Sequence, residues 1–523
     1  MKVMIKAKRV LWIDDEVESL RSHILALAER GYEIVPASSG DDGAELLKEG
    51  GYDAVLLDQM MPGLDGISTL ERLRRIDPSV PIIMVTQNSD EGLVNEALGR
   101  KIDDFLVKPL RPEQIASTLK RILDQEKLIQ GNLPRDYVAD FERISSMKHR
   151  DLSWEDWVEI YLSLARWDLE LDRHPQIGLK ETHEDLKLEL NSIFAKYIER
   201  NYLEWLRGGD RPVLSVDLIE RYIVPLLKEG RQVFFVVLDC MRLDQWLAIE
   251  PLLYPYFNVR RDYYYSILPT ATLYSRNAIF SGLFPGQIAE KYPQYWQEIP
   301  GDEKSTNRHE KKFLQMNLQR LGVQLKPGVQ YFKIFDVQGG EEYLKRVSSF
   351  NRISVAALVV NFIDILTHKR SQLDILQQMA PDESAFRSLT RTWFEHSTVF
   401  QIFKIMSQKE AVTIVTSDHG SILGNRASKV FGNRDTTTSL RVKVGVNLGC
   451  NPDEALHITE PKRYMLPHDF PGKNYILAKE DFYFVYPNQF HEYRRQFKGG
   501  FQHGGISMEE MILPIAIMSP KHG

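Results

Sequence analysis

The chain has 523 residues, 43% of them hydrophobic and 26% charged, which is typical of a globular protein with room for about three domains. Its net charge of −6 argues against a general nucleic-acid coat, and its two cysteines argue against a disulfide framework or a cysteine-based zinc site. The early acidic residues argue against a secretory signal, and the longest apolar run is shorter than the roughly 20 residues of a membrane span. We therefore expect a cytoplasmic protein without a membrane span.

Residues 1–125 alternate short apolar strands with helical stretches, for example over residues 41–48 and 68–75. Five consecutive strand–helix units predict a parallel, doubly wound sheet. The predicted strands cover residues 10–13, 32–36, 54–57, 82–86 and 105–107.

Polar side chains follow these strands at their carboxyl ends. Asp14 and Asp15 follow the first strand and Asp58 follows the third. Three carboxylates brought together repel each other unless a cation lies among them, and hard oxygen ligands suit Mg²⁺. Thr86 and Lys108, after the fourth and fifth strands, can contact an anion on Asp58. The sequence therefore predicts a magnesium site beside an anion-bearing aspartate.

The same residues, in the contexts LLDQMMPGLDG, MVTQ and FLVKPL, closely resemble a response-regulator receiver domain, which has a flavodoxin-like fold. Phe105 stands where that family keeps its switch aromatic residue. The resemblance implies that Asp58 accepts a phosphoryl group from a histidine-kinase partner, with Mg²⁺ held by Asp14, Asp15 and Asp58. The face around Phe105 would then change its contacts.

Residues 126–208 have the pattern of a small helical bundle. Leu133 and Pro134, after a charged run, predict the end of the receiver, and Ser153 with Asp156 approximates a capping box. No helix with a basic recognition face is evident, so the bundle is expected to transmit receiver contacts or to form a dimer surface. Two aromatic stripes at helical spacing indicate core packing more than a binding platform. These stripes are Trp154, Trp157, Ile160, Tyr161, Leu164 and Trp167, and then Phe194, Tyr197, Ile198, Tyr202 and Trp205.

Residues 209–523 carry acidic residues and histidines where strands end. A buried strand at 233–238 ends in Asp239, and one at 412–415 is followed by Asp418 and His419. Ligands bind at such carboxyl ends in open α/β sheets. Thr272 stands where a helix would begin, which suits either a phosphate-facing hydroxyl or a plain helix cap.

Further candidates lie later in the chain. Asp364 and His368 are four residues apart and would share one face of a helix. His503 precedes Gly504 and Gly505, which permit close backbone approach before a last strand at 511–518. A surface pair and a simple turn are the plainer interpretations of these two features. Together with Asp239, Thr272, Asp418 and His419, they suit two Zn²⁺-like ions, and two ions about 4 Å apart can clamp a phosphoryl displacement.

Five segments resemble, in order, the motifs of the PglZ domain of the alkaline phosphatase superfamily over roughly 210–523: LDCMRLDQW, LPTATLYSRNAIFSGL, NFIDILTH, VTSDHG and QHGGISMEEMILP. The resemblance implies that Thr272 is the nucleophile and forms a covalent phosphothreonine. It also implies two zinc sites and a loose set of phosphate contacts. The implied residues are Asp239, Asp418 and His419 with Thr272 for one zinc, Asp364, His368 and His503 for the other, and Arg242, Arg276 and Asn277 for phosphate.

The expected fold class is α/β, with a flavodoxin-like receiver at 1–125, a central helical bundle at 126–208 and an alkaline phosphatase-like α/β domain at 209–523. This order resembles the PorX-type response regulators, a family tied to type IX secretion and gliding. The resemblance implies that phosphorylation of Asp58 regulates a phosphodiesterase acting on nucleotide-type diesters, through a homodimer. The alternative is an adaptor, in which the metals are structural and the phosphorylated dimer binds a sigma factor and the sensor kinase.

Overall fold

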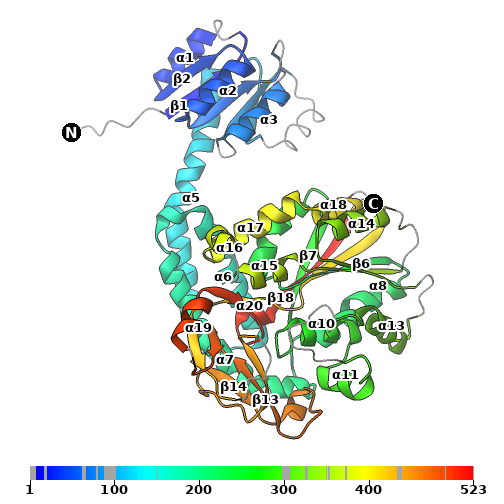
Figure 1. Ribbon diagram of the computed structural model, residues 1–523. Helices are drawn as coiled ribbons and strands as arrows, with labels where there is room; N and C mark the ends of the chain where they lie inside the picture. The colour runs from blue at the N-terminus through cyan, green and yellow to red at the C-terminus, as the bar shows by residue number, and fades with distance from the viewer. Residues whose placement is uncertain are drawn as a thin grey trace. The chain divides into compact units, whose positions relative to one another are not determined.

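The computed structural model describes residues 8–16, 20–61, 66–77, 80–87, 102–148, 150–296, 307–323, 328–348, 350, 354–370, 374–432, 439–488 and 490–521. The chain forms two compact units, Met1–Ala139 and Asp140–Gly523 (Figure 1). Within the described residues, every helix is too short or too polar to cross a membrane.

The first unit is a five-stranded sheet in the order β2-β1-β3-β4-β5, and all of its neighbouring strands are parallel. This confirms the predicted doubly wound sheet and all five predicted strands. The strands are β1 (Lys8–Ile13), β2 (Tyr32–Ala37), β3 (Ala54–Asp58), β4 (Ile82–Thr86) and β5 (Asp104–Val107), and the helices are α1 (Arg21–Ala28), α2 (Gly40–Glu49), α3 (Gly66–Ile76) and α5 (Pro112–Met147).

The sheet of the first unit is buried on both faces, as expected of a parallel sheet. Leu47 of α2 and Leu73 of α3 pack in one apolar cluster with alternate residues of β1 and β3. Leu27 of α1 and Leu119 of α5 pack in a second cluster with the intervening residues. Because these strands are parallel, the carboxyl ends of β1, β3, β4 and β5 lie at one edge of the sheet.

Helix α5 corrects one prediction. Pro134 was expected to mark the end of the receiver, but α5 is a continuous helix of 36 residues with Pro134 inside it. Proline removes one backbone N–H and disfavours the helix interior, yet a long helix can continue through it. The division between the two units, at Ala139, therefore falls within a helix rather than in a loop.

The second unit is built on a six-stranded sheet in the order β7-β18-β10-β6-β9-β8. Strand β6 is parallel to β9 and β10, and β18 is antiparallel to β10 and β7. The strands are β6 (Gln232–Leu238), β7 (Phe257–Tyr265), β8 (Gln330–Ile334), β9 (Val355–Val360), β10 (Ala411–Thr416) and β18 (Ile512–Pro520).

Helices cover both faces of this sheet, with α10 and α13 on one side and α17 and α18 on the other (Figure 1). The alternation of side chains along β6 divides its residues between the two apolar clusters. Phe234, Val236 and Leu238 belong to the cluster with α17 and α18, and Val233, Phe235 and Val237 to the cluster with α10 and α13. Their bounds are α10 (Thr272–Ser281), α13 (Glu310–Arg320), α17 (Glu383–His396) and α18 (Thr398–Met406).

The predicted helical bundle forms α6 (Trp154–Arg173) and α7 (Lys180–Leu206) of the second unit. Ser153 and Asp156 form the expected capping box, with Asp156 N donating to Ser153 Oγ and Ser153 N donating to the Asp156 carboxylate. The aromatic stripes are confirmed as core, because most of their residues share one apolar cluster with Tyr265 and Tyr475 of the sheet-bearing part.

Smaller elements complete the second unit. A three-stranded antiparallel sheet has the order β13-β15-β14, and two strand pairs join β11 to β17 and β12 to β16. These strands are β11 (Ile422–Gly424), β12 (Arg426–Lys429), β13 (Val442–Val446), β14 (Ala455–Ile458), β15 (Lys473–Ala478), β16 (Phe482–Val485) and β17 (Gly500–Gln502). The remaining helices are α8 (Val224–Lys228), α9 (Leu243–Ile249), α11 (Pro285–Lys291), α14 (Val337–Val347), α15 (Phe362–Arg370), α16 (Asp374–Met379), α19 (Phe490–Phe497) and α20 (Met508–Met511).

Candidate functional site

An acidic pocket lies at the carboxyl edge of the receiver sheet. Asp14 follows β1 and Asp58 ends β3, and both are buried, whereas Asp15 is exposed. Oxygens of these three carboxylates lie within 4.8 Å of one another. Lys108, after β5, places its Nζ 2.9 Å from Asp58 Oδ2 and 3.3 Å from Asp14 Oδ2. The structure thus brings together the residues expected to hold Mg²⁺.

The electrostatics of this pocket favour a bound cation. Burial raises the pKa of Asp58 above its usual value, although Lys108 acts in the opposite direction. Within the described residues, Asp58 Oδ1 is buried without a hydrogen-bond partner, whereas Asp14 Oδ2 is paired with Lys108. A buried carboxylate oxygen is costly unless it is paired, so Asp58 Oδ1 fits a ligand of a hard divalent ion.

The two expected switch residues of the receiver are placed differently. Thr86 ends β4 and is only 5% exposed, so its hydroxyl belongs to the buried edge that carries Asp58. Phe105 lies in β5 and is 37% exposed, so its ring is at the surface.

Thr272 and His419 meet in the second unit. Thr272 is the first residue of α10 and is 1% exposed, and its Oγ1 lies 3.0 Å from His419 Nε2. His419 Nδ1 lies 3.0 Å from the carbonyl oxygen of Gly420. Because a carbonyl only accepts hydrogen bonds, Nδ1 carries the ring proton and Nε2 presents a lone pair towards Thr272. The Thr272 side chain therefore faces a potential metal ligand, which favours the phosphate-facing interpretation over a helix cap.

In Asp239 and in Asp418, one carboxylate oxygen accepts hydrogen bonds and the other accepts none among the described residues. Asp418 Oδ1 accepts the backbone N–H groups of Cys240 and His419, and Asp239 Oδ2 accepts a hydrogen bond from Asn361 Nδ2. The other oxygens, Asp239 Oδ1 and Asp418 Oδ2, are buried, and within the part of the chain that the structure describes they lack a hydrogen-bond partner. They lie 3.9 and 3.8 Å from His419 Nε2.

These distances define a compact donor set of two carboxylate oxygens, one imidazole nitrogen and one hydroxyl. The pKa of Asp418 is raised well above its usual value by burial and by the neighbouring charge of Asp239. Two anions in a dry site repel each other, and Arg276, 3.8 Å from Asp418 Oδ2, offsets this repulsion only in part. The set matches the N/O ligands of tetrahedral zinc.

The backbone around this set is tightly packed. Cys240, directly after Asp239, has a positive φ of 65°, which turns its N–H towards Asp418. Gly420 follows His419, and a Cβ there would lie 1.9 Å from the carbonyl oxygen of Glu509. Only glycine fits that close approach, which explains the glycine in the SDHG segment.

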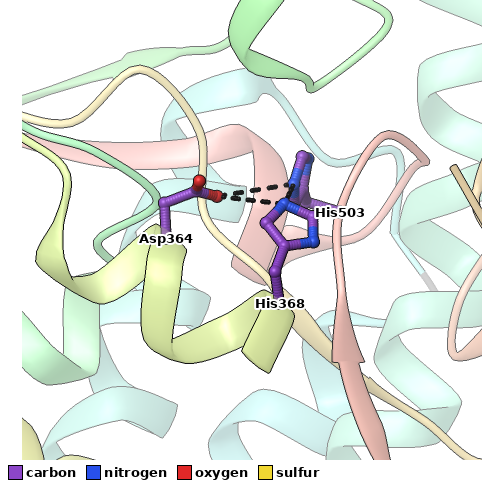
Figure 2. A group of neighbouring side chains, drawn as sticks. All are labelled: Asp364, His368 and His503. Atoms are coloured by element: carbon purple, nitrogen blue, oxygen red, sulfur yellow. Dashed lines mark hydrogen bonds and ion pairs between the residues drawn. The ribbon is translucent and has the colours of Figure 1, made fainter. Parts of the chain in front are cut away.

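Asp364, His368 and His503 form a second donor set (Figure 2). Asp364 and His368 share one face of α15, as predicted, with His368 Nε2 3.4 Å from Asp364 Oδ1. His503 follows β17, and its Nε2 lies 3.6 Å from Asp364 Oδ1 and 3.0 Å from His368 Nε2. The rings of His503 and His419 stack with centroids 4.3 Å apart, so the two sets are neighbours.

The three expected phosphate contacts are placed differently. Arg276 is buried, contacts Asp239, and lies 3.8 Å from Asp418 Oδ2, so its guanidinium is within the first donor set. Asn277 is buried in α10 and donates to the carbonyl oxygen of Leu273.

The expected phosphate contact of Arg242 must be revised. Arg242 is fully buried, and its guanidinium nitrogens donate to Asp244 and to Glu383 Oε1, the latter at 2.6 Å. Both carboxylates are protein groups that neutralise the guanidinium. The guanidinium is therefore held in an ion network of protein carboxylates.

Several supporting residues escaped the sequence analysis. Asn361 follows β9 and holds Asp239, and its polar interruption of an apolar run at a strand end was a usable signal. Glu310 of α13 accepts a hydrogen bond from Arg276 Nε at 2.6 Å, and Lys333 lies 3.1 Å from the same carboxylate. No local sequence pattern predicts that Arg276, Glu310 and Lys333 contact one another, because they are far apart in the chain.

Comparisons with known proteins agree with this arrangement. Residues 10–120 match the response regulator receiver domain, residues 127–206 the PorX response regulator linker domain, and residues 218–518 the BREX system PglZ alkaline phosphatase-like domain.

Curated relatives are similar over only part of their own length. The transcriptional regulatory protein ResD of Bacillus subtilis is 30% identical over 31% of this chain and 68% of ResD. DltR of Streptococcus agalactiae is 34% identical over 24% of this chain and 55% of DltR. Among solved structures, chemotaxis protein CheY4 of Vibrio cholerae is 26% identical, with a TM-score of 0.21, over 22% of this chain and 98% of CheY4.

A receiver joined to an alkaline phosphatase-like domain defines a response regulator with an enzyme-like output domain. The receiver implies a histidine kinase as its phosphodonor partner. The chain belongs to the PglZ domain family, as a response regulator of the PorX type with the PorX linker between receiver and PglZ domain.

Proposed function

We propose that this protein is a response regulator whose PglZ domain is a zinc-dependent phosphodiesterase with Thr272 as nucleophile. The observation that carries the proposal is the meeting of Thr272 Oγ1 and His419 Nε2, 3.0 Å apart and buried, beside two carboxylates with unpartnered oxygens among the described residues. A helix cap or a core threonine would not need such surroundings.

The donor sets support two metal ions. Asp239, Asp418 and His419, with Thr272, suit one zinc, and Asp364, His368 and His503 suit the other. In the receiver, Asp14, Asp15 and Asp58 suit Mg²⁺. Zinc, when bound, would lower the pKa of the threonine hydroxyl and offset the negative charge of the phosphate.

The chain's own residues supply the rest of the chemistry. The N-terminus of α10 directs backbone N–H groups and a positive dipole end towards an anion beside Thr272. Thr272 Oγ1 loses its proton and forms a bond to phosphorus while the bond from phosphorus to one ester oxygen breaks, and that oxygen takes up a proton and leaves as an alcohol. Phosphorus then joins Thr272 to the second alcohol as a threonine phosphodiester. Water cleaves its bond to Thr272, which releases a phosphomonoester and restores the hydroxyl.

The preferred substrate is a nucleotide-type phosphodiester, as the family resemblance implies. In this proposal a histidine kinase phosphorylates Asp58 in the cytoplasm, and phosphorylation favours a homodimer. The dimer regulates the hydrolase, and with it type IX secretion and gliding. Arg276, buried beside Asp239, is the phosphate-contact candidate that lies nearest the donor set.

Metal analysis and one pair of variants test the enzyme proposal. Purified protein is expected to contain about two zinc equivalents and to hydrolyse a chromogenic phosphodiester. Thr272→Val removes the hydroxyl while keeping the side-chain shape, and should lower kcat about 10³-fold or more without releasing zinc. Thr413→Val is the control, because Thr413 is buried in β10 away from the carboxyl end of that strand. Equal hydrolysis by both variants would refute a nucleophilic Thr272.

The adaptor function is the second candidate, favoured by the structure of the linker. Helices α6 and α7 bury their aromatic stripes in the core of the second unit and provide no basic recognition helix among the described residues. Titration of a sigma factor against phosphorylated protein and against Asp58→Ala tests this function. The same affinity for both would argue against a phosphorylation-dependent adaptor.

A further inference from the structure

A buried ion network connects the linker helices to the part of the second unit that carries the candidate metal sites. Lys187 of α7 is 6% exposed, and its Nζ lies 3.0 Å from Asp168 Oδ2 of α6 and 2.8 Å from Glu383 Oε2 of α17. Glu383 Oε1 accepts a hydrogen bond from Arg242 Nη1 at 2.6 Å. One carboxylate therefore joins a linker lysine to Arg242.

Arg242 lies beside three of the chain segments that carry candidate metal ligands, namely those of Asp239, of Asp418 with His419, and of His503. It is three residues after Asp239, and its Cγ would lie 3.4 Å from a Cβ on Gly420, the residue after His419. Its guanidinium lies over the ring of Phe501, 5.6 Å from the ring centroid, and Phe501 is two residues before His503. A displacement of Arg242 would therefore disturb the packing of the loops that carry His419 and His503.

The Arg242 guanidinium is held by Asp244 through Nε and Nη2 and by Glu383 through Nη1, so its position depends in part on Glu383 and, through Glu383, on Lys187. Burial by itself raises the pKa of Glu383, but Arg242 and Lys187 outweigh it and lower that pKa to about 2. Glu383 is therefore ionised at neutral pH and bonded to both cations. The Glu383 side chain is partly buried, with 19% of its surface exposed. Removal of either cation leaves its carboxylate with only one of these two cationic partners, which favours rearrangement of the remaining pair.

Helix α7 supports the site at a second point. Asn191 Nδ2 donates to Glu509 Oε2, and Asn191 Oδ1 accepts the backbone N–H of Met508, both at 2.9 Å. The carbonyl of Glu509 is the group that packs against Gly420. Helix α7 therefore reaches the ligand-bearing loops indirectly at two points, through Glu383 and Arg242 at one and through Glu509 at the other.

We propose that Arg242 is a positioning residue for the two candidate metal sites and that Lys187, provided by the linker helix α7, fixes it through Glu383. This proposal rests on the proposed function, because the groups that Arg242 positions are the ligands of the proposed zinc sites. It assigns the linker a direct part in shaping the hydrolase site, in addition to connecting two domains. Residues that orient metal ligands from outside the coordination shell commonly change metal affinity 10–100-fold when mutated.

Lys187→Met tests the proposal, with Lys180→Met as a matched control. Lys180 also lies on α7 and pairs with α17, through Asp382 at 2.6 Å, but the two side chains are 50% and 43% exposed. Such an exposed pair contributes little. Glu383→Gln is the second variant, because it removes the charge that links Lys187 to Arg242 while keeping the side-chain shape.

Two measurements on the full-length protein decide the outcome. Hydrogen exchange of metal-free protein should be about 10-fold faster in peptides covering 239–246 and 417–421 for Lys187→Met and Glu383→Gln, and unchanged for Lys180→Met. Competition with a chromophoric chelator should show a zinc Kd raised about 10-fold in the same two variants.

Exchange that rises uniformly over residues 140–521, or no difference from Lys180→Met, would overturn the positioning role. Wild-type protein that takes up no zinc would instead refute the proposed function, and the exchange data would still decide the role of Lys187.

Discussion

Phe194 offers a direct test of whether the linker helices and the PglZ domain share one core. This residue of α7 is fully buried. Its ring stacks on Tyr265 of β7, with the ring centroids 6.3 Å apart, and meets Trp157 of α6 edge-on, with the centroids 5.2 Å apart. Phe194→Ala therefore removes packing between α7, α6 and the sheet-bearing part at the same time. If these parts form one cooperative structure, the whole second unit should lose stability.

The expected loss follows from the burial of Phe194. Truncation of a buried phenylalanine to alanine typically costs 3–5 kcal/mol, because the cavity is only partly refilled. Unfolding of the roughly 380 residues of the second unit has an entropy of about 0.8 kcal/mol/K at its midpoint. A loss of about 4 kcal/mol should therefore lower Tm by about 5 °C.

Calorimetry of the full-length protein measures this change, with Leu188→Ala as the control. Leu188 lies on the same helix but is 39% exposed, so its truncation should lower Tm by no more than about 1 °C. The transition of the second unit should move as a single peak in Phe194→Ala. A new, lower transition for the linker alone, with the main peak in place, would refute a common core.

Two further predictions concern charged groups. Asp58→Asn should abolish phosphorylation by acetyl phosphate, and chelation of Mg²⁺ should do the same to the wild type, whereas Asp53→Asn should still be labelled in a phosphate-affinity gel because Asp53 pairs with Lys8 instead. The pKa of Glu383 is lowered to about 2 in the folded state, from a usual value near 4.5. Its ionisation therefore stabilises the protein above about pH 4.5, and this stability, about 3 kcal/mol at most, is lost as pH falls towards 2. The free energy of unfolding of Glu383→Gln should lack this part of the pH dependence, and the same dependence on pH in both proteins would contradict the network.

The residues that follow buried strands were the most predictable part of the site. Asp58, Asp239 and Asp418 each follow an apolar run that can hardly be anything but an interior strand, and parallel strands bring their carboxyl ends to one edge of a sheet. His368 was predictable from Asp364 by helical spacing alone. In each case a local pattern fixed the place of the side chain.

Arg242 shows why the rest could not be predicted. It stands three residues after a metal-ligand candidate, which suggested a phosphate contact, but its partner Glu383 is 141 residues away. Lys187 is 196 residues from the same carboxylate. Such pairings depend on how helices pack, and no local periodicity encodes them. The prediction that Pro134 marks the end of the receiver was wrong for the opposite reason. There a local preference against helix was outweighed by the long helix around the proline.

Phosphorylation of Asp58 should change the association of the protein more than the conformation of a single chain. Conversion of a two-state population from 1:99 to 99:1 needs about 5.5 kcal/mol. One charge-assisted hydrogen bond made in only one state supplies about 2 kcal/mol, which moves the competent population from 1% to roughly a quarter. If a dimer needs two competent protomers, its association constant rises with the square of that population, by about 500-fold.

Sedimentation over a range of protein concentrations, with and without an acyl-phosphate analogue, measures that change. The analogue should shift the dimerisation curve of the wild type by two to three orders of magnitude in concentration, because the phosphoryl mimic acts once in each protomer. Asp58→Asn should follow the unphosphorylated curve under both conditions. Superimposable wild-type curves would mean that the phosphoryl group makes the same contacts in monomer and dimer, since a ligand shifts an equilibrium only through its differential affinity for the two states.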